Sequence, residues 1–183
     1  QGMTVGPGFV DIHCRAGGEV WTHQDPVSVA QYHLSGGATS LCCTLYHNIG
    51  FEGALEGGRR IKEAIDSGTP GNIVGIHFEG PFLNPKYGAD SKKARKPDPN
   101  EYMEYLRRFG SFIRQWTFAP EIEGTDEFLS AVRSQGIAMA IGHSEASPQR
   151  VLEVAQKGVS ICTHITNATG VSISPSTYAG TKE

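Results

Sequence analysis

The chain has 183 residues, enough to bury a substantial core, and this length suggests one domain. Hydrophobic residues make up 38% and charged residues 19%, which is ordinary for a globular protein. The formal net charge is -3, the sequence holds no apolar run of membrane-spanning length, and its first residues lead us to expect no signal peptide. We therefore expect a cytoplasmic protein with no nucleic-acid partner and no membrane partner.

Short apolar runs alternate with amphipathic stretches from one end of the chain to the other. The apolar runs, rich in Ile, Val, Phe, Thr and Cys, predict strands at 8–14, 40–46, 72–79, 115–120, 138–143 and 160–165. The amphipathic stretches predict helices at 26–34, 53–66, 100–109, 126–135 and 148–156. Thr125 and Ser147 stand at the expected helix starts, the latter followed by proline.

Strand and helix alternate up to a sixth strand, which predicts a parallel α/β fold. Several strands are apolar throughout, as expected when both faces of a sheet are covered. A doubly wound sheet and an incomplete (β/α)8 barrel both fit this order of elements. A complete barrel typically takes about 250 residues, and this chain has room for about six βα units.

Two groups of residues favour an ordinary structural interpretation. The four cysteines lie in strand-like segments without a C-x-x-C pair, so we expect free thiols acting as small core residues: Cys14, Cys42, Cys43 and Cys162. A basic stretch before Pro97 has no interleaved aromatic residues and predicts a solvated loop: Lys92, Lys93, Arg95 and Lys96.

Acidic and imidazole side chains recur where the predicted strands end. Alternation places His77 and Glu79 on one face of their strand, which Gly80 and Pro81 then end. A buried carboxylate at a strand end needs a cation, either a metal or a basic side chain, and this strand alone does not choose between them.

Two later strands bring histidines to the corresponding position. His143 and His164 each lie at the end of an apolar strand, and in a parallel sheet both would lie at the same rim as Glu79. Two imidazoles and one carboxylate leave a fourth position for water, which is the composition of a catalytic zinc site. On the first strand, His13 and Arg15 share a face, where a two-metal hydrolase would have histidine at both positions.

Several motifs resemble those of the N-acetylglucosamine-6-phosphate deacetylase family, within the amidohydrolase superfamily. The stretch from Pro7 to His13 is similar to the opening strand of the superfamily, and residues 77–86 are similar to a more specific signature of the family. Further similar motifs follow in the family's order at 119–121, 142–144, 163–164 and 167–168. The resemblance covers almost the whole chain.

The resemblance implies an incomplete (β/α)8 TIM barrel of the metal-dependent hydrolase type, with residues 1–183 forming a partial amidohydrolase barrel domain. It implies hydrolysis of the acetamide of N-acetylglucosamine 6-phosphate, a small-molecule amino-sugar phosphate, to glucosamine 6-phosphate and acetate. One divalent metal, commonly zinc, would be held by Glu79, His143 and His164. Contacts with the sugar phosphate would come from Ala89, Asp90, Asn167 and Ala168. We also expect a homodimer for the full-length enzyme.

The sequence departs from the family pattern at several positions. Arg15 stands where two-metal members have histidine, so we expect one metal. Asp90 stands where the family often has histidine, which predicts an altered preference among acetylated amino-sugar phosphates. The family's catalytic aspartate, on the eighth strand, is expected beyond Glu183, so we assign no catalytic residue within the chain.

Two alternatives remain at this stage. The chain could act on a related N-acyl substrate as another amidohydrolase, although the signature at 77–86 argues against this. It could also be a non-catalytic fragment that binds a sugar phosphate or a metal. We expect residues 1–183 alone not to hydrolyse the sugar phosphate at a useful rate, because general acid–base catalysis typically contributes about 10²–10⁴-fold.

Overall fold

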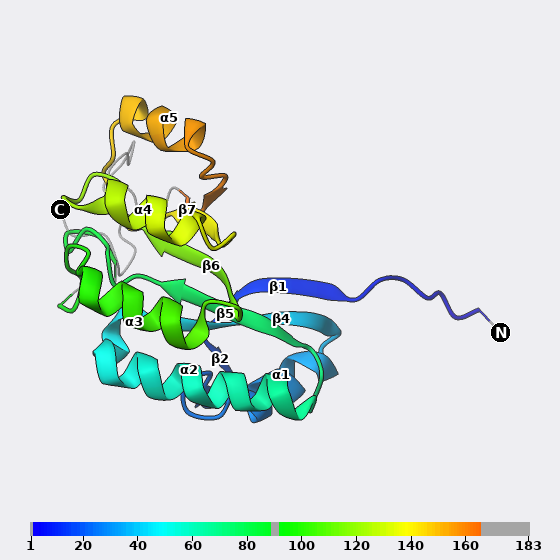
Figure 1. Ribbon diagram of the computed structural model, residues 1–183. Helices are drawn as coiled ribbons and strands as arrows, with labels where there is room; N and C mark the ends of the chain where they lie inside the picture. Colours follow the sequence, from blue (N-terminus) through cyan, green and yellow to red (C-terminus); the bar gives the residue numbers. More distant parts are fainter. Residues whose placement is uncertain (1, 89–91, 166–183) are drawn as a thin grey trace.

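The computed structural model describes residues 2–88 and 92–165, and it is an α/β structure with one parallel sheet (Figure 1). The sheet runs in the order β1-β4-β5-β6-β7-β8, and every neighbouring pair is parallel. Its strands are β1 (Phe9–Cys14), β4 (Ala38–Tyr46), β5 (Ile73–Glu79), β6 (Ile113–Phe118), β7 (Ala138–Ile141) and β8 (Ile161–Cys162).

The strands follow one another across the sheet in chain order, so each helix crosses from one strand to its neighbour. A doubly wound sheet has a point where the strand order reverses, and the described strands show no such reversal. The sheet is curled, with β1 and β8 at the two ends of the described order. The doubly wound alternative is therefore wrong.

The helices match the amphipathic stretches of the sequence to within a few residues. They are α1 (Pro26–Ser35), α2 (Gly50–Ser67), α3 (Pro99–Phe109), α4 (Thr125–Arg133) and α5 (Pro148–Gln156). Helices α1 to α4 pack side by side in chain order and contact the sheet (Figure 1). In the part of the chain that the structure describes, none of the helices has the length and apolar character needed to cross a membrane.

Helix starts are fixed by side-chain caps in three cases. Asp25, Asp98 and Ser147 each accept a hydrogen bond from a backbone N–H of the first turn, and each precedes a proline. We expected Thr125 to cap α4, but its side chain makes no capping hydrogen bond. It is the first residue of α4, and its hydroxyl donates to the carbonyls of Pro120 and Ile122, so it fastens the preceding loop.

The core lies between the sheet and the helices. Phe78 of β5 stacks on Trp116 of β6, with ring centroids 4.7 Å apart, and Phe128 of α4 meets the same indole edge to face. Tyr105 of α3 packs against Phe78 at 4.8 Å. These large side chains are fully buried, and they make the helix-covered face of the sheet aromatic and apolar.

Some local structure differs from the sequence expectations. The short hairpin of β2 (Ala16–Gly17) and β3 (Val20–Trp21) and the 3-10 turn η1 (His47–Ile49) were not predicted, because two or three residues carry no readable periodicity. Cys14, Cys42 and Cys43 are buried free thiols, as expected, but Cys162 is exposed, so its assignment to the core is wrong. Cys162 lies on β8, at the end of the described strand order, where one side of the strand has no described neighbour.

The basic stretch is also less uniform than a solvated loop. Arg95 forms an ion pair with Glu101 of α3, a residue that is only 8% exposed. The backbone N–H of Arg95 donates to the carbonyl oxygen of Pro81, 3.0 Å away. Arg95 therefore fastens the segment after β5 to α3, because a buried carboxylate requires a cation.

Candidate metal centre

Polar side chains from the ends of two parallel strands, β1 and β5, and from the two turns after β7 and β8 meet at one carboxylate. Glu79 is the last residue of β5 and is fully buried. His143 and His164 follow β7 and β8 by two residues, and His13 and Arg15 come from the end of β1. The rim position expected for Glu79, His143 and His164 is thus confirmed by their contacts.

The distances around Glu79 define the centre. Nε2 of His164 lies 2.8 Å and Nε2 of His143 lies 3.0 Å from Oε1 of Glu79. Nε2 of His13 lies 3.3 Å from Oε2 of the same carboxylate. The ligand atoms of His13, Glu79 and His164 all lie within 4.8 Å of one another, close enough to hold a metal ion.

The contact made by Nδ1 of His143 determines which nitrogen of its ring carries a proton. Nδ1 lies 3.3 Å from the carbonyl oxygen of Tyr87, which only a protonated nitrogen satisfies. A neutral ring then has a bare Nε2, which faces a carboxylate oxygen that also has no proton to offer. Either an imidazolium or a metal ion between Nε2 and Glu79 resolves this conflict. A backbone carbonyl that fixes the tautomer is also the usual support of a metal-bound histidine.

Arg15 supplies a positive charge at the centre. Its Nε donates to Oε2 of Glu79 at 2.5 Å, its Nη2 pairs with Oε1, and Nη2 also lies 2.8 Å from Nε2 of His164. Since arginine only donates, this contact requires a lone pair on Nε2 of His164, whereas the 2.8 Å contact of the same nitrogen with Oε1 of Glu79 requires a proton there. The guanidinium therefore contacts the same two atoms that would bind a metal.

The electrostatics of Glu79 favour the ionised form. Burial by itself would raise the pKa of the carboxyl group, but hydrogen bonds from the three imidazoles and the guanidinium outweigh burial. They hold the pKa of Glu79 well below its usual value. A permanently charged, buried carboxylate needs cationic neighbours, and these donors are suited to a divalent ion as well as to arginine.

A polar layer lies next to the centre on the same face of the sheet. His77 is fully buried, and its ring nitrogens contact the hydroxyls of Thr44 at 3.1 Å and Thr117 at 2.8 Å. The hydroxyl of Thr117 in turn contacts that of Thr163 at 2.9 Å. Burial, with a smaller contribution from neighbouring His13, lowers the pKa of His77 to about 3, so this imidazole is neutral at pH 7.

Glu121 organises the loops above the centre. Its carboxylate accepts from the side chains of Asn84 at 2.9 Å and Ser144 at 2.6 Å, and from the backbone of Glu145 at 2.8 Å. These bonds join the loops that follow β5, β6 and β7. Glu121 thereby holds in place the two residues that follow His143.

Both histidines beyond the strand ends have an uncommon backbone conformation. His143 has φ 52° and His164 has φ 55°, in the left-handed region that residues other than glycine rarely adopt. Gly88 packs directly against the ring of His143, since a β-carbon there would lie 2.5 Å from Nδ1. Such strained residues gather at functional sites.

The sequence analysis identified most of this centre but not all of it. The parts played by His13 and Arg15 were not assigned, although both follow the same strand-end signal as Glu79. Of the expected substrate contacts, Ala89, Asp90, Asn167 and Ala168 all lie outside the described residues. The assignment of Glu79, His143 and His164 as the metal ligands stays a prediction.

Comparison with known proteins shows that the chain is similar to one group of deacetylases. No family model matches the chain. The chain is 31% identical over 182 residues to the N-acetylglucosamine-6-phosphate deacetylase of Bos taurus, covering 91% of this chain and 43% of the relative. It is 32% identical over 171 residues to the N-acetylgalactosamine-6-phosphate deacetylase of Shewanella sp. (strain ANA-3), covering 90% of this chain and 42% of the relative.

Solved structures agree with the sequence comparison. The chain superimposes on N-acetylglucosamine-6-phosphate deacetylase from Thermotoga maritima with a TM-score of 0.79 and 29% identity, covering 95% of this chain and 46% of that one. The enzyme from Mycobacterium smegmatis gives a TM-score of 0.77 and 30% identity, covering 88% and 43%. The chain spans less than half the length of the relatives that it matches.

Proposed function

Because this chain is homologous to the N-acetylglucosamine-6-phosphate deacetylases, we propose that it belongs to a metal-dependent hydrolase. The reaction is hydrolysis of the acetamide of N-acetylglucosamine 6-phosphate to acetate and the free amino sugar phosphate. A Mycobacterium smegmatis relative has been solved in complex with this sugar phosphate, with a TM-score of 0.76. The observation that carries the proposal is the convergence of three imidazoles on the buried carboxylate of Glu79.

We propose that Glu79, His143 and His164 hold one divalent metal, zinc by preference. The contact of Nδ1 of His143 with a backbone carbonyl, and the approach of both Nε2 atoms to Oε1 of Glu79, support this assignment. Imidazole and carboxylate are common zinc ligands, and a three-ligand site leaves a position for water. A metal bound there would polarise the acetamide carbonyl and lower the pKa of its water.

Arg15 explains why one metal is proposed and not two. His13 contacts Glu79 from β1, as a ligand of a second metal would, but the residue two positions later is an arginine. Its guanidinium supplies positive charge to both carboxylate oxygens, which is the charge that a second cation would otherwise provide.

The remaining assignments rest on the family resemblance. We propose that the curled sheet is part of a (β/α)8 barrel, and that Ala89, Asp90, Asn167 and Ala168 contact the sugar phosphate. The relatives extend well beyond the matched part, and we propose that an aspartate there takes the proton of the attacking water and returns it to the leaving amine. Cytoplasmic location and a homodimer of the full-length enzyme belong to the same proposal.

A second substrate is favoured by one specific observation. The Shewanella relative, a deacetylase of N-acetylgalactosamine 6-phosphate, is as similar to the chain as the glucosamine relatives. The two sugars differ at one hydroxyl, and a site built to hydrogen-bond a hydroxyl can discriminate strongly between such substrates. Asp90 replaces a family histidine and, when ionised, can only accept hydrogen bonds.

The test uses the full-length protein, with metal content and turnover measured together. We expect about one metal per chain, and loss of it in His143→Ala. The matched control is His77→Gln, which removes a buried imidazole without touching Glu79 and should keep its metal. Unchanged metal content in His143→Ala would overturn the ligand assignment.

Acetate release then separates the candidate functions. Comparison of kcat/KM for the two sugar phosphates, in the wild type and in Asp90→His, identifies the substrate and tests the role of Asp90. Equal selectivity in both proteins would contradict that role. Stoichiometric metal with no acetate release from either sugar would instead support a non-catalytic binding protein.

A further inference from the structure

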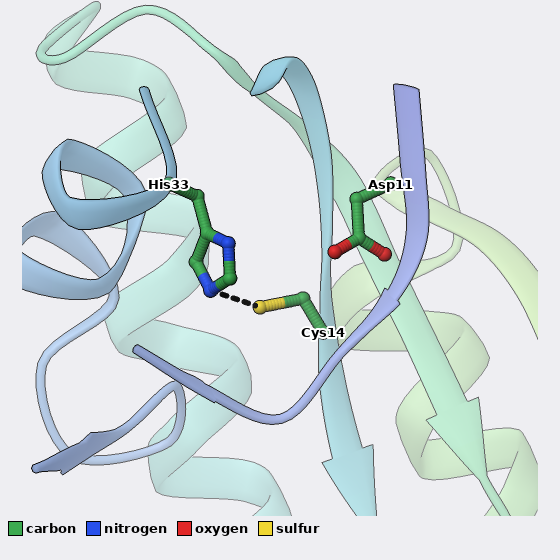
Figure 2. Close-up of side chains that lie close together, drawn as sticks. All are labelled: Asp11, Cys14 and His33. Carbon is green, nitrogen blue, oxygen red and sulfur yellow. Dashed lines mark hydrogen bonds between the residues drawn. The ribbon is translucent and has the colours of Figure 1, made fainter. Parts of the chain in front are cut away.

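A second group of metal-ligating side chains lies on the other side of β1 from His13. Asp11 and Cys14 of β1 and His33 of α1 point toward one another (Figure 2), with their ligand atoms within 4.8 Å of one another. Sγ of Cys14 lies 3.2 Å from Nε2 of His33. Cys14 is buried, whereas Asp11 and His33 are half-buried.

An irregularity in β1 creates this arrangement. Regular alternation would place Asp11 with His13 on one face and Cys14 on the other. The pairing of β1 with β4 shifts in register between Asp11 and Cys14, as at a β-bulge. The shift brings Asp11 and Cys14 to the side covered by α1, while His13 still contacts Glu79.

A backbone carbonyl adds a fourth donor. The oxygen of Ala16 lies 2.9 Å from Nε2 of His33 and 3.5 Å from Sγ of Cys14. Zinc bonds of about 2.0–2.3 Å in a tetrahedron give ligand-to-ligand distances of about 3.4–3.6 Å. The separations of 3.2 and 3.5 Å from Sγ of Cys14 are close to these values, whereas the 2.9 Å between Nε2 of His33 and the carbonyl oxygen is a hydrogen-bond distance. The ligand atom of Asp11 lies within 4.8 Å of those of Cys14 and His33.

The charges at this group also call for a cation. Within residues 2–88 and 92–165, the carboxylate of Asp11 forms no ion pair with lysine or arginine, and its hydrogen bond comes from the backbone of His13 at 2.9 Å. Burial, together with the nearby carboxylate of Asp11, raises the pKa of the Cys14 thiol to about 11, so a thiolate forms there only with a cation beside it. Thiolate together with imidazole is a donor set that favours zinc.

We propose that Asp11, Cys14 and His33, with the carbonyl oxygen of Ala16, bind a divalent metal of the zinc type at a site separate from the Glu79 centre. Binding releases the thiol proton to solvent and requires the ring proton of His33 to move from Nε2, where it is donated to the carbonyl oxygen of Ala16, to Nδ1. The metal fastens α1 to β1. It therefore holds the strand that presents His13 and Arg15 to Glu79.

Cobalt(II) distinguishes the two sites, because only a thiolate ligand gives it intense near-ultraviolet charge-transfer absorption. The experiment titrates metal-free full-length protein with cobalt(II). We expect the absorption to appear in the wild type and to be lost in Cys14→Ser and in His33→Gln. The matched control is Cys162→Ser, which removes an exposed thiol outside the group and should keep the absorption.

The titration of the wild type alone can overturn the proposal, so the test does not depend on whether a variant folds. If cobalt(II) saturates the protein without thiolate absorption, Cys14 is not a ligand. The same conclusion follows if the absorption persists in a folded Cys14→Ser protein or disappears in Cys162→Ser. If the proposed metal site at Glu79 is wrong, this result is unchanged, since none of the ligands proposed there contains sulfur.

Discussion

The two faces of β5 and β6 show how one pair of strands serves two different purposes. Toward the helices, Phe78 and Trp116 stack in an aromatic core. Toward the other face, His77 and Thr117 form a hydrogen-bonded layer beside Glu79. Both faces are fully buried, so burial alone does not separate them.

The two faces differ in which replacement side chains they tolerate. The aromatic face needs volume and shape, because close-packed apolar side chains gain from contact with any well-fitting neighbour. The polar face needs specific partners, because each buried hydrogen-bonding atom that loses its partner destabilises the fold. Alternation along the strand places the two requirements only one residue apart.

The largest effect is expected on the aromatic face. Trp116→Ala should lower the free energy of unfolding by about 3–5 kcal/mol, through lost transfer energy and a cavity. Urea denaturation measures this change. Trp21→Ala provides the control, since Trp21 is 39% exposed and its removal should cost about 1 kcal/mol or less. Similar losses in both variants would contradict the assigned core.

On the polar face, His77→Leu keeps most of the volume but removes the partners of two threonine hydroxyls. We expect a loss of about 1–3 kcal/mol in unfolding free energy. His77→Gln retains hydrogen-bonding capacity and should recover part of that loss in the same denaturation assay. A leucine variant as stable as the wild type would show that the layer acts by packing alone.

Removing the arginine from the Glu79 centre should strengthen metal binding. Arg15→Gln takes away a positive charge in contact with two proposed ligand atoms, and we expect zinc affinity to rise about tenfold, or about 1.4 kcal/mol. Competition against a chelator of known affinity measures this. Arg114→Gln is the control, because Arg114 lies on the exposed start of β6 and donates to the carbonyl of Val74. Weaker zinc binding in Arg15→Gln would instead make Arg15 a support of the metal.

The smallest effect concerns the helical layer over the aromatic face. Asp25→Ala removes the cap of α1 and should cost about 1 kcal/mol. Hydrogen bonds from Ser28 lower the pKa of Asp25, so the stabilisation is present above the ordinary pKa and is lost as the pH falls through the lowered value. Thermal unfolding of both proteins from neutral to acid pH should therefore converge. A constant difference would contradict this origin.

Sequence patterns predicted the main elements because helices and strands here are long enough to show their period. They also placed Glu79, His143 and His164 at one rim, since parallel strands end together. The sequence could not show that Arg15 contacts Glu79 and His164, because that depends on where a long side chain turns. The bulge that gathers Asp11 and Cys14 arises from pairing with β4, a non-local contact without a signal in β1 itself.

The left-handed backbone of His143 and His164 has a consequence for how such proteins change over evolutionary time. Each residue adopts a conformation that costs about 1–2 kcal/mol for most side chains but less for asparagine or glycine. A single exchange of either histidine for asparagine would therefore remove a proposed metal ligand while relaxing the backbone. If the proposed metal centre is correct, descendants of this chain could lose metal binding and remain folded, so relatives without the centre but with intact architecture are expected to arise by this route.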